Sequence, residues 1–169
     1  MTKEIINRVA NSDLITIDLE DYAPQKDVLE LDVKRFLFKG VILKEKEFRS
    51  DLKSFDFSRY KNAVVAVFCS SDAILPMWSY MLIASYLNPI CSDLKFGKKE
   101  DVIKEIILEK IGNLNEDEYN DKKVIIKGCG SLNLDESVYI AITKKLQNNV
   151  SSLMFGEACS VVPVYKKNV

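Results

Sequence analysis

The chain has 169 residues, with 24 Lys and Arg against 25 Asp and Glu, four cysteines and no histidine. The absence of histidine excludes Ser-His-Asp and Cys-His nucleophile systems, and it excludes metal sites that need an imidazole ligand. Acid–base chemistry would have to come from Asp, Glu, Lys, Tyr or Cys side chains. A formal net charge of −1 gives no overall electrostatic reason to bind nucleic acid or an anionic membrane.

Length and composition indicate one soluble, cytoplasmic domain. With 47 % hydrophobic residues the chain can build a full core, and 169 residues is an ordinary size for one domain. The N-terminus lacks the apolar run of a signal peptide. The longest uncharged stretch, 73–91, contains Pro76 and Pro89 and is barely long enough to span a bilayer, so we interpret it as a buried helix.

The first 60 residues predict an N-terminal β-β-α layer. Apolar and polar residues alternate at 15–20 and again at 29–34, which is typical of half-buried strands. From Lys44 onward, Phe48, Leu52 and Phe55 fall at helical spacing. We expect this layer to extend a larger core formed by residues 61–169.

Residues 61–169 alternate predicted strands with predicted helices. The continuous apolar run at 63–68 is typical of a strand covered on both faces, and further strands are expected at 94–96 and 124–127. A helix is predicted to begin after Ser71 or Asp72, with Pro76 in its first turn, and to run up to Asn88-Pro89. A second helix is predicted over 102–111 and ends at Gly112. A third helical pattern runs from Val138 to Leu153 and should end near residues 155–156, before a last strand at 161–165.

This alternation predicts a single α/β domain over residues 1–169. We expect a three-layer α/β/α core, with a mostly parallel four-stranded sheet of flavodoxin-like or Rossmann-like order, plus the N-terminal β-β-α extension. Ligands of open parallel sheets bind outside the carboxyl ends of the strands, where the strand order reverses. The loops that meet this description are Cys69-Ser70-Ser71-Asp72, Gly97-Lys98-Lys99 and Gly128-Cys129-Gly130-Ser131.

In a flavodoxin-like order, Cys69 and Cys129 lie at the same edge of the sheet. Each is followed by an expected helix N-terminus, with Ser71 or Asp72 as the cap in one case and Asn133 in the other. Free N–H groups and the helix dipole at such positions favour an anion or a thiolate.

Three alternatives stay open for these cysteines. They are small buried hydrophobes, or they form a thiol or metal site, or they are bystanders while the loop backbones bind a small anion. The paired Gly128 and Gly130 would let a ligand approach the backbone. Thiolates alone can hold zinc or an iron–sulfur cluster, so zinc and iron are the candidate metals.

Cys91 and Cys159 precede predicted strands, which places them at the opposite edge of the sheet. Cys159 would complete a three-thiolate metal site with Cys69 and Cys129 only if the last strand runs antiparallel or its loop folds back. Asp18, Glu20 and Asp21 form a separate acidic group. Their carboxylates either bind a hard cation or form the solvated face of an alternating strand.

Several segments resemble one family over nearly the whole chain. They are NRVANSDLITIDLEDY (7–22), LKEKEFRSDL (43–52), CSSDAILPMWSYMLIASYL (69–87), VIIKGC (124–129) and SLMFGEACSVVPVYK (152–166). These segments are similar to the domain-of-unknown-function 2480 family of small bacterial proteins. The resemblance implies no activity, substrate or cofactor. It implies that cysteines at the positions of Cys69, Cys129 and Cys159 belong to the family pattern, whereas Cys91 does not.

The sequence therefore predicts a small-ligand-binding or metal-binding protein with its site around Cys69 and Cys129. One alternative is a thiol-dependent enzyme or redox protein, with Asp72 or Lys127 modulating the cysteine. Another is a non-enzymatic homodimeric interaction protein that uses the N-terminal layer. We expect a small anionic ligand or a second copy as partner, and neither nucleic acid nor a membrane.

Overall fold

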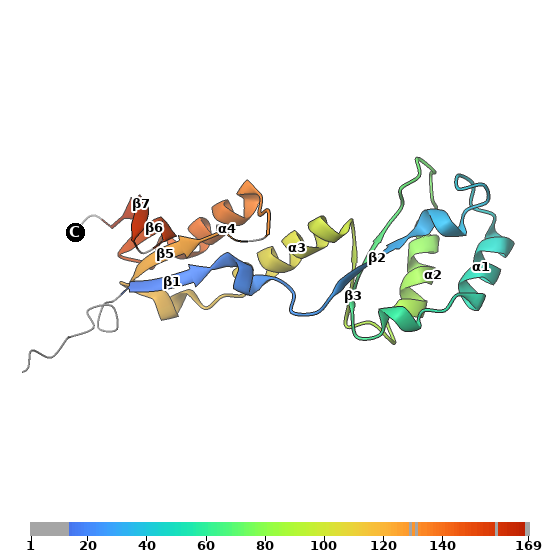
Figure 1. Ribbon diagram of the computed structural model, residues 1–169, viewed down its shortest axis with the longest axis horizontal. Coiled ribbons are helices and arrows are strands. Elements are labelled where there is room, and N and C mark those ends of the chain that lie inside the picture. The colour runs from blue at the N-terminus through green and yellow to red at the C-terminus, as the bar shows by residue number, and fades with distance from the viewer. Residues whose placement is uncertain (1–13, 129, 131, 158, 168–169) are drawn as a thin grey trace, which may run out of the picture. The chain divides into compact units, whose positions relative to one another are not determined.

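Figure 1 shows the computed structural model, which describes residues 14–128, 130, 132–157 and 159–167. Its four α-helices and its strands make an α/β protein, as the alternation in the sequence predicts. The chain divides into two compact units. Pro24–Glu105 forms the inserted unit, and Met1–Ala23 with Ile106–Val169 forms the discontinuous unit. The boundary expected near residue 60 lies inside the inserted unit.

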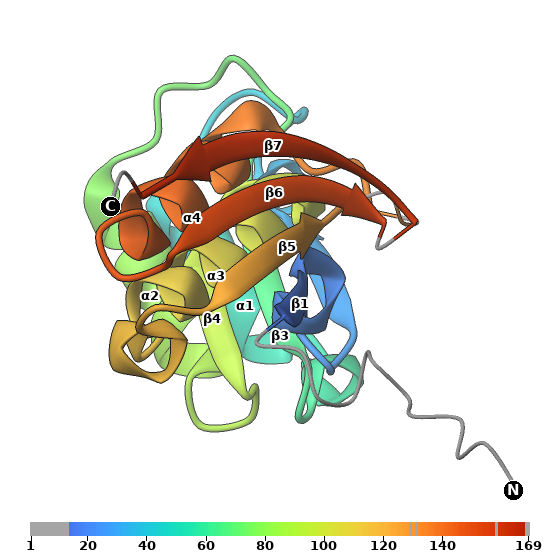
Figure 2. The same cartoon turned by 90° about the vertical axis from the view of Figure 1, so that its left-hand side faces the viewer.

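The discontinuous unit is built on a four-stranded sheet of order β1-β5-β6-β7. The strands are β1 (Leu14–Asp18), β5 (Lys123–Lys127), β6 (Ser152–Glu157) and β7 (Ser160–Lys166). β1, β5 and β6 run parallel, and β7 returns antiparallel to β6, as Figure 2 shows. Helix α4 (Glu136–Leu146) connects β5 to β6, and its Tyr139 ring meets the Phe155 ring of β6 edge to face at 5.8 Å.

The inserted unit is built on a parallel sheet of order β2-β3-β4. Its strands are β2 (Val28–Asp32), β3 (Val64–Phe68) and β4 (Asp93–Phe96), connected by α1 (Glu45–Ser54) and α2 (Met77–Leu87). Both helices pack on one face of the sheet, where they share a core with it. That core includes Leu31, Val65 and Val67 from the strands, Phe48 and Leu52 from α1, and Ile83 and Leu87 from α2.

The start of α3 (Lys99–Gly112) lies on the opposite face of the three-stranded sheet. Glu30 and Lys95 point to this face, because they alternate with residues that pack into the core. The Glu30 carboxylate accepts a hydrogen bond from the Lys99 N–H at 2.9 Å, and the Lys95 ammonium pairs with Glu105 at 3.0 Å. The inserted unit therefore has helix on both faces of its sheet.

The prediction of one four-stranded sheet with an N-terminal extension is wrong in its strand pairing. β1 pairs with β5 and β2 pairs with β3, so each N-terminal strand joins a different sheet. Both are edge strands, which explains why both show the alternation of a half-buried strand. The parallel strands of each sheet follow chain order without a reversal, so the flavodoxin-like order is wrong as well.

The last predicted helix is too long, because α4 ends at Leu146 and residues 152–157 form β6. Val150 and Leu153 are buried and continue the helical spacing by coincidence. A helix end before β6 is indicated by the polar residues in Asn148-Asn149-Val150-Ser151-Ser152, although the apolar spacing continues past it. Asn and Ser side chains compete for backbone hydrogen bonds and favour a helix end.

Asp32, at the end of β2, anchors the loop that follows β3. Its carboxylate accepts hydrogen bonds from the N–H and the hydroxyl of Ser70 and from the Lys34 N–H. Partial burial favours the neutral acid, but these donors favour the carboxylate more strongly, and the net effect lowers the pKa of Asp32 below 3.8.

We expect Asp32→Asn to destabilise the inserted unit by about 1–2 kcal/mol at pH 7, because it removes charge-assisted hydrogen bonds at a partly solvated position. A lowered folded pKa stabilises the fold above pH 3.8, and this contribution is lost as the pH falls through the folded pKa. The deficit of the variant should therefore shrink below pH 3.8. Urea unfolding followed by the fluorescence of Trp78, the only tryptophan, measures it.

The matched control is Asp51→Asn, which removes an exposed carboxylate on α1. A deficit of equal size in both variants, or one that does not change between pH 7 and pH 3, would contradict the role given to Asp32.

Candidate functional site

The loop after β3 contains Cys69, Ser70, Ser71 and Asp72. Cys69 is half-buried and packs against the core of the inserted unit. Ser71 accepts the Ala73 N–H within the loop, and α2 begins only at Met77. Ser71 and Asp72 are therefore not its N-caps, and Cys69 does not lie at a helix N-terminus. The argument for an anion or thiolate from the helix dipole does not apply to Cys69.

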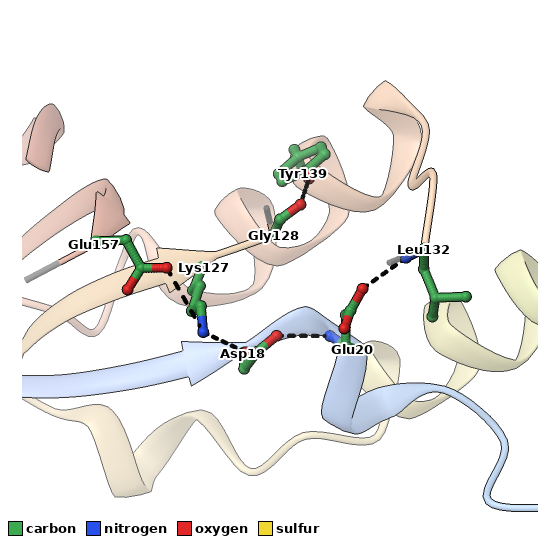
Figure 3. A network of polar contacts seen from close by, with 7 residues as sticks. All are labelled: Asp18, Glu20, Lys127, Gly128, Leu132, Tyr139 and Glu157. Atoms are coloured by element: carbon green, nitrogen blue, oxygen red, sulfur yellow. Dashed lines mark hydrogen bonds and ion pairs between the residues drawn. The ribbon is translucent and has the colours of Figure 1, made fainter. Parts of the chain in front are cut away.

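The loop after β5 contains Gly128 and Gly130, while Cys129 and Ser131 lie outside the described residues. Figure 3 shows that the carboxylate of Glu20 reaches this loop and accepts the Leu132 N–H at 2.6 Å. A Cβ at position 130 would overlap the Glu20 carboxylate, so Gly130 is needed for this approach. The loop therefore already holds an anion, and that anion is a side chain of the chain itself.

The helix after this loop begins at Glu136, and its N-cap is Asp135 rather than Asn133. The Asp135 carboxylate accepts from the N–H and the hydroxyl of Ser137. The Tyr139 hydroxyl donates to the Gly128 carbonyl at 3.0 Å, which fixes the first turns of α4 to the end of β5 (Figure 3). A Cβ at position 128 would overlap the Tyr139 ring, so Gly128 is also a close-packing position.

The two predicted site loops follow strands of different sheets in different units. β3 belongs to the inserted unit and β5 to the discontinuous unit. The expectation that Cys69 and Cys129 share one sheet edge depended on the flavodoxin-like order, which the strand pairing contradicts. A ligand or metal site that uses both loops stays a prediction.

Lys127 joins three strand ends at the carboxyl edge of the four-stranded sheet. Its ammonium lies 3.3 Å from the Asp18 carboxylate of β1 and 3.6 Å from the Glu157 carboxylate of β6 (Figure 3). The hydrogen bond with Asp18 and the negative charge of Glu157 raise the pKa of Lys127. Asp18 also accepts the Glu20 N–H at 3.0 Å. The partly exposed carboxylates of Asp18 and Glu20 are thus held by an ammonium and two backbone amides.

Cys159 lies at the same edge as the Lys127 ion pairs. The prediction that it sits at the opposite edge is wrong, because β7 runs antiparallel and Cys159 is in the turn between β6 and β7. Among the described residues, no group of three cysteine or acidic side chains is arranged to hold a metal ion. The set of Cys69, Cys129 and Cys159 as zinc or iron ligands includes an undescribed residue and stays a prediction.

An apolar cavity of about 320 Å³ lies between α4 and the sheet of the discontinuous unit. Its lining comes from β5, α4, β6 and β7 and consists of Ile126, Tyr139, Ile142, Thr143, Leu153, Met154, Phe155 and Val164. The Thr143 hydroxyl donates to the Tyr139 carbonyl within the helix. The sequence carries no signal for this cavity, because its walls are ordinary core residues and its volume depends on the spacing between α4 and the sheet.

We predict that Gly130→Ala displaces the Glu20 carboxylate from the Leu132 N–H and costs about 1–2 kcal/mol, the price of one charge-assisted hydrogen bond. The same loss is produced by Glu20→Ala, so the two substitutions should not be additive. In the Glu20→Ala background, Gly130→Ala should cost less than about 0.5 kcal/mol. Amide hydrogen exchange at Val124, Ile125 and Ile126 measures the stability of this unit. Full additivity would show that the glycine is needed for another reason.

We predict different reactivities for two of the cysteines. Burial raises the pKa of Cys91, whereas Cys159 is exposed in a turn. Because the thiolate is the reactive form, Cys91 should react with a disulfide reagent at pH 8 at least about ten-fold more slowly than Cys159. The Cys159→Ser variant should lack a fast phase of the reaction with the disulfide reagent, and the Cys91→Ser variant should lack a slow phase. A fast phase that is lost in Cys91→Ser would contradict the prediction.

Comparison with known proteins identifies a family but no activity. The family model described as "Protein of unknown function (DUF2480)" matches residues 3–167. No curated protein and no solved structure matches the chain. In the described part of the chain, no helix is both long and apolar enough to cross a membrane. The match covers nearly the whole sequence, and the chain belongs to the DUF2480 family.

Proposed function

We propose that the protein binds a small, largely apolar molecule in the cavity between α4 and the strands β5, β6 and β7. The observation that carries this proposal is the cavity itself. Its volume of about 320 Å³ is at the lower end of the range of ligand pockets, and its lining is almost entirely aliphatic and aromatic. Each buried CH₂ group of a ligand would contribute about 0.8 kcal/mol there.

The position of Tyr139 connects this cavity with the loop that the sequence singles out. The Tyr139 ring lines the cavity, and its hydroxyl donates to the Gly128 carbonyl at the carboxyl edge of the sheet. A ligand in this cavity would fulfil the small-ligand role that the sequence predicts and would lie next to the predicted loop. Its binding would not require the cysteines.

The electrostatics of the loop favour a neutral ligand over the anion expected from sequence. The Leu132 N–H already donates to Glu20, and the Ser137 N–H donates to Asp135. An anionic ligand at either of these two amides would have to displace a carboxylate that is tethered to the chain. A neutral, apolar ligand in the cavity leaves both hydrogen bonds intact.

The shifted pKa values support a binding role rather than acid–base catalysis. Catalytic acids and bases are usually tuned toward neutral pH. Here each resolved shift moves a group away from neutrality, to higher pKa for Tyr, Cys and Lys and to lower pKa for Asp and Glu. These groups are Tyr22 (to about 12), Asp32, Asp56, Tyr60, Tyr80, Cys91, Glu116 and Lys127.

Titration with indole, a compact neutral aromatic molecule, tests the proposal. We expect saturable changes in the methyl NMR signals of Ile126, Ile142 and Met154, with a dissociation constant of about 0.1–1 mM for so small a probe. Val164→Trp should abolish these changes, because the indole side chain would cover the cavity wall formed by β7.

The matched control is Val41→Trp, which makes the same substitution at an exposed valine of the inserted unit that does not line the cavity. It should leave the dissociation constant unchanged within about two-fold. Absence of saturable shifts in the wild-type protein, or equal binding by both tryptophan variants, would overturn the proposal.

A further inference from the structure

We propose that the exposed face of α2 is a homodimer contact, in which α2 of one copy packs antiparallel against α2 of a second copy. The contact belongs to the inserted unit, and it is independent of the ligand cavity in the discontinuous unit.

The first observation is a group of large apolar side chains on this face. Ile74 is 99 % exposed, Met77 71 %, Met81 72 % and Phe96 69 %. Met77 and Met81 are one helical turn apart, Ile74 lies just before the helix, and the Phe96 ring meets the α2 residue Tyr80 edge to face at 5.5 Å. Single exposed apolar residues are ordinary, but a contiguous group marks an interaction surface.

The second observation is the lack of charged residues in α2, which bears on the kind of partner that this face can bind. Charged residues make up 29 % of the chain, yet residues 73–91 contain none. Nucleic acid, an anionic membrane and an acidic peptide all require a cluster of basic side chains. The guanidinium that lies against α2 is that of Arg49, 5.0 Å from the Trp78 ring, and it is already paired with Glu45. Residues 73–91 of two copies bring no like charges together, and the carboxylate of Asp93 lines the groove beside α2.

The third observation is the shape of the face. A groove of about 470 Å³ follows the C-terminal half of α2 toward β4, and its mixed polar and apolar lining consists of Met81, Ala84, Ser85, Asn88, Cys91, Ser92, Asp93 and Leu94. The protruding methionines thus lie toward the N-terminal end of α2, and small side chains and the groove lie toward its C-terminal end.

A two-fold axis that crosses α2 near its middle places the N-terminal half of one helix against the C-terminal half of the helix in the second copy. It places Met81 of one copy over Ala84 and Ser85 of the other, and Met77 over Asn88, and it makes each of these contacts twice. Methionine suits such a contact because its flexible side chain adapts to an irregular groove. α2 has 11 residues and spans about 16 Å, so we expect a small interface and a dissociation constant in the range of about 10 µM to 1 mM.

Sedimentation equilibrium of the full chain over a wide concentration range tests the proposal. The wild-type protein should form a reversible dimer. Met81→Glu should raise the dissociation constant at least ten-fold, because it places a carboxylate in the groove that Asp93 also lines. At 72 % exposure the substitution should leave the monomer folded, which circular dichroism and thermal melting verify.

Ile140→Glu is the matched control, since Ile140 is a 60 % exposed apolar residue on α4 and is not part of this face. It should leave the dissociation constant unchanged within about two-fold. A wild-type protein that is monomeric at all concentrations up to about 1 mM, or a dimer that Met81→Glu does not weaken, would overturn the proposal.

Discussion

The parallel pairing of β1 with β5 is the constraint on which the discontinuous unit depends. Leu14 pairs with Lys123, and Asp18 pairs with Lys127. In the sequence, the whole inserted unit therefore separates two strands that are direct neighbours in the sheet. Closing a flexible loop of about 100 residues costs several kcal/mol of chain entropy. A folded inserted unit shortens the flexible part of that loop, and we infer that its formation favours the β1–β5 pairing. The hydrogen bond from the Lys110 ammonium to the Ala23 carbonyl, 2.9 Å, then ties the end of the first segment to the start of the second.

The polar groups at the carboxyl edge of the four-stranded sheet serve this same closure. Lys127 holds the ends of β1 and β6 through Asp18 and Glu157, and Glu20 holds the loop after β5 through the Leu132 N–H. In an open α/β sheet with a strand-order reversal, this edge would be the ligand crevice. Here the parallel strands follow chain order, and the edge carries interactions that hold distant segments together. The apolar cavity of this unit lies between α4 and the sheet instead.

Local features of the fold follow from the sequence, whereas the pairing of distant segments does not. The end of α3 at Gly112 and the strands β3 and β5 are confirmed, since Gly stop signals and apolar runs act within a few residues. The alternation at 15–20 identifies a half-buried strand but contains no information on which strand it pairs with. At the site, the paired Gly128 and Gly130 indicate that a ligand can approach the backbone, and this stays a prediction. The groups that lie against these glycines are the Tyr139 ring at Gly128 and the Glu20 carboxylate at Gly130, and neither contact leaves a sequence signature.

Helix α2 shows how one sequence pattern can serve two purposes. Its lack of charge predicts a buried helix, and Ile83 and Leu87 are fully buried in the core of the inserted unit. Trp78 also packs on that core, with its ring 5.9 Å from Phe48. One face of a helix is enough to cover a sheet, and a surface helix ordinarily places charged residues on the other. In α2 the outward positions Met77 and Met81 are apolar as well. In the homodimer that we propose, this second apolar face packs against another copy of α2, whose ends are complementary to it.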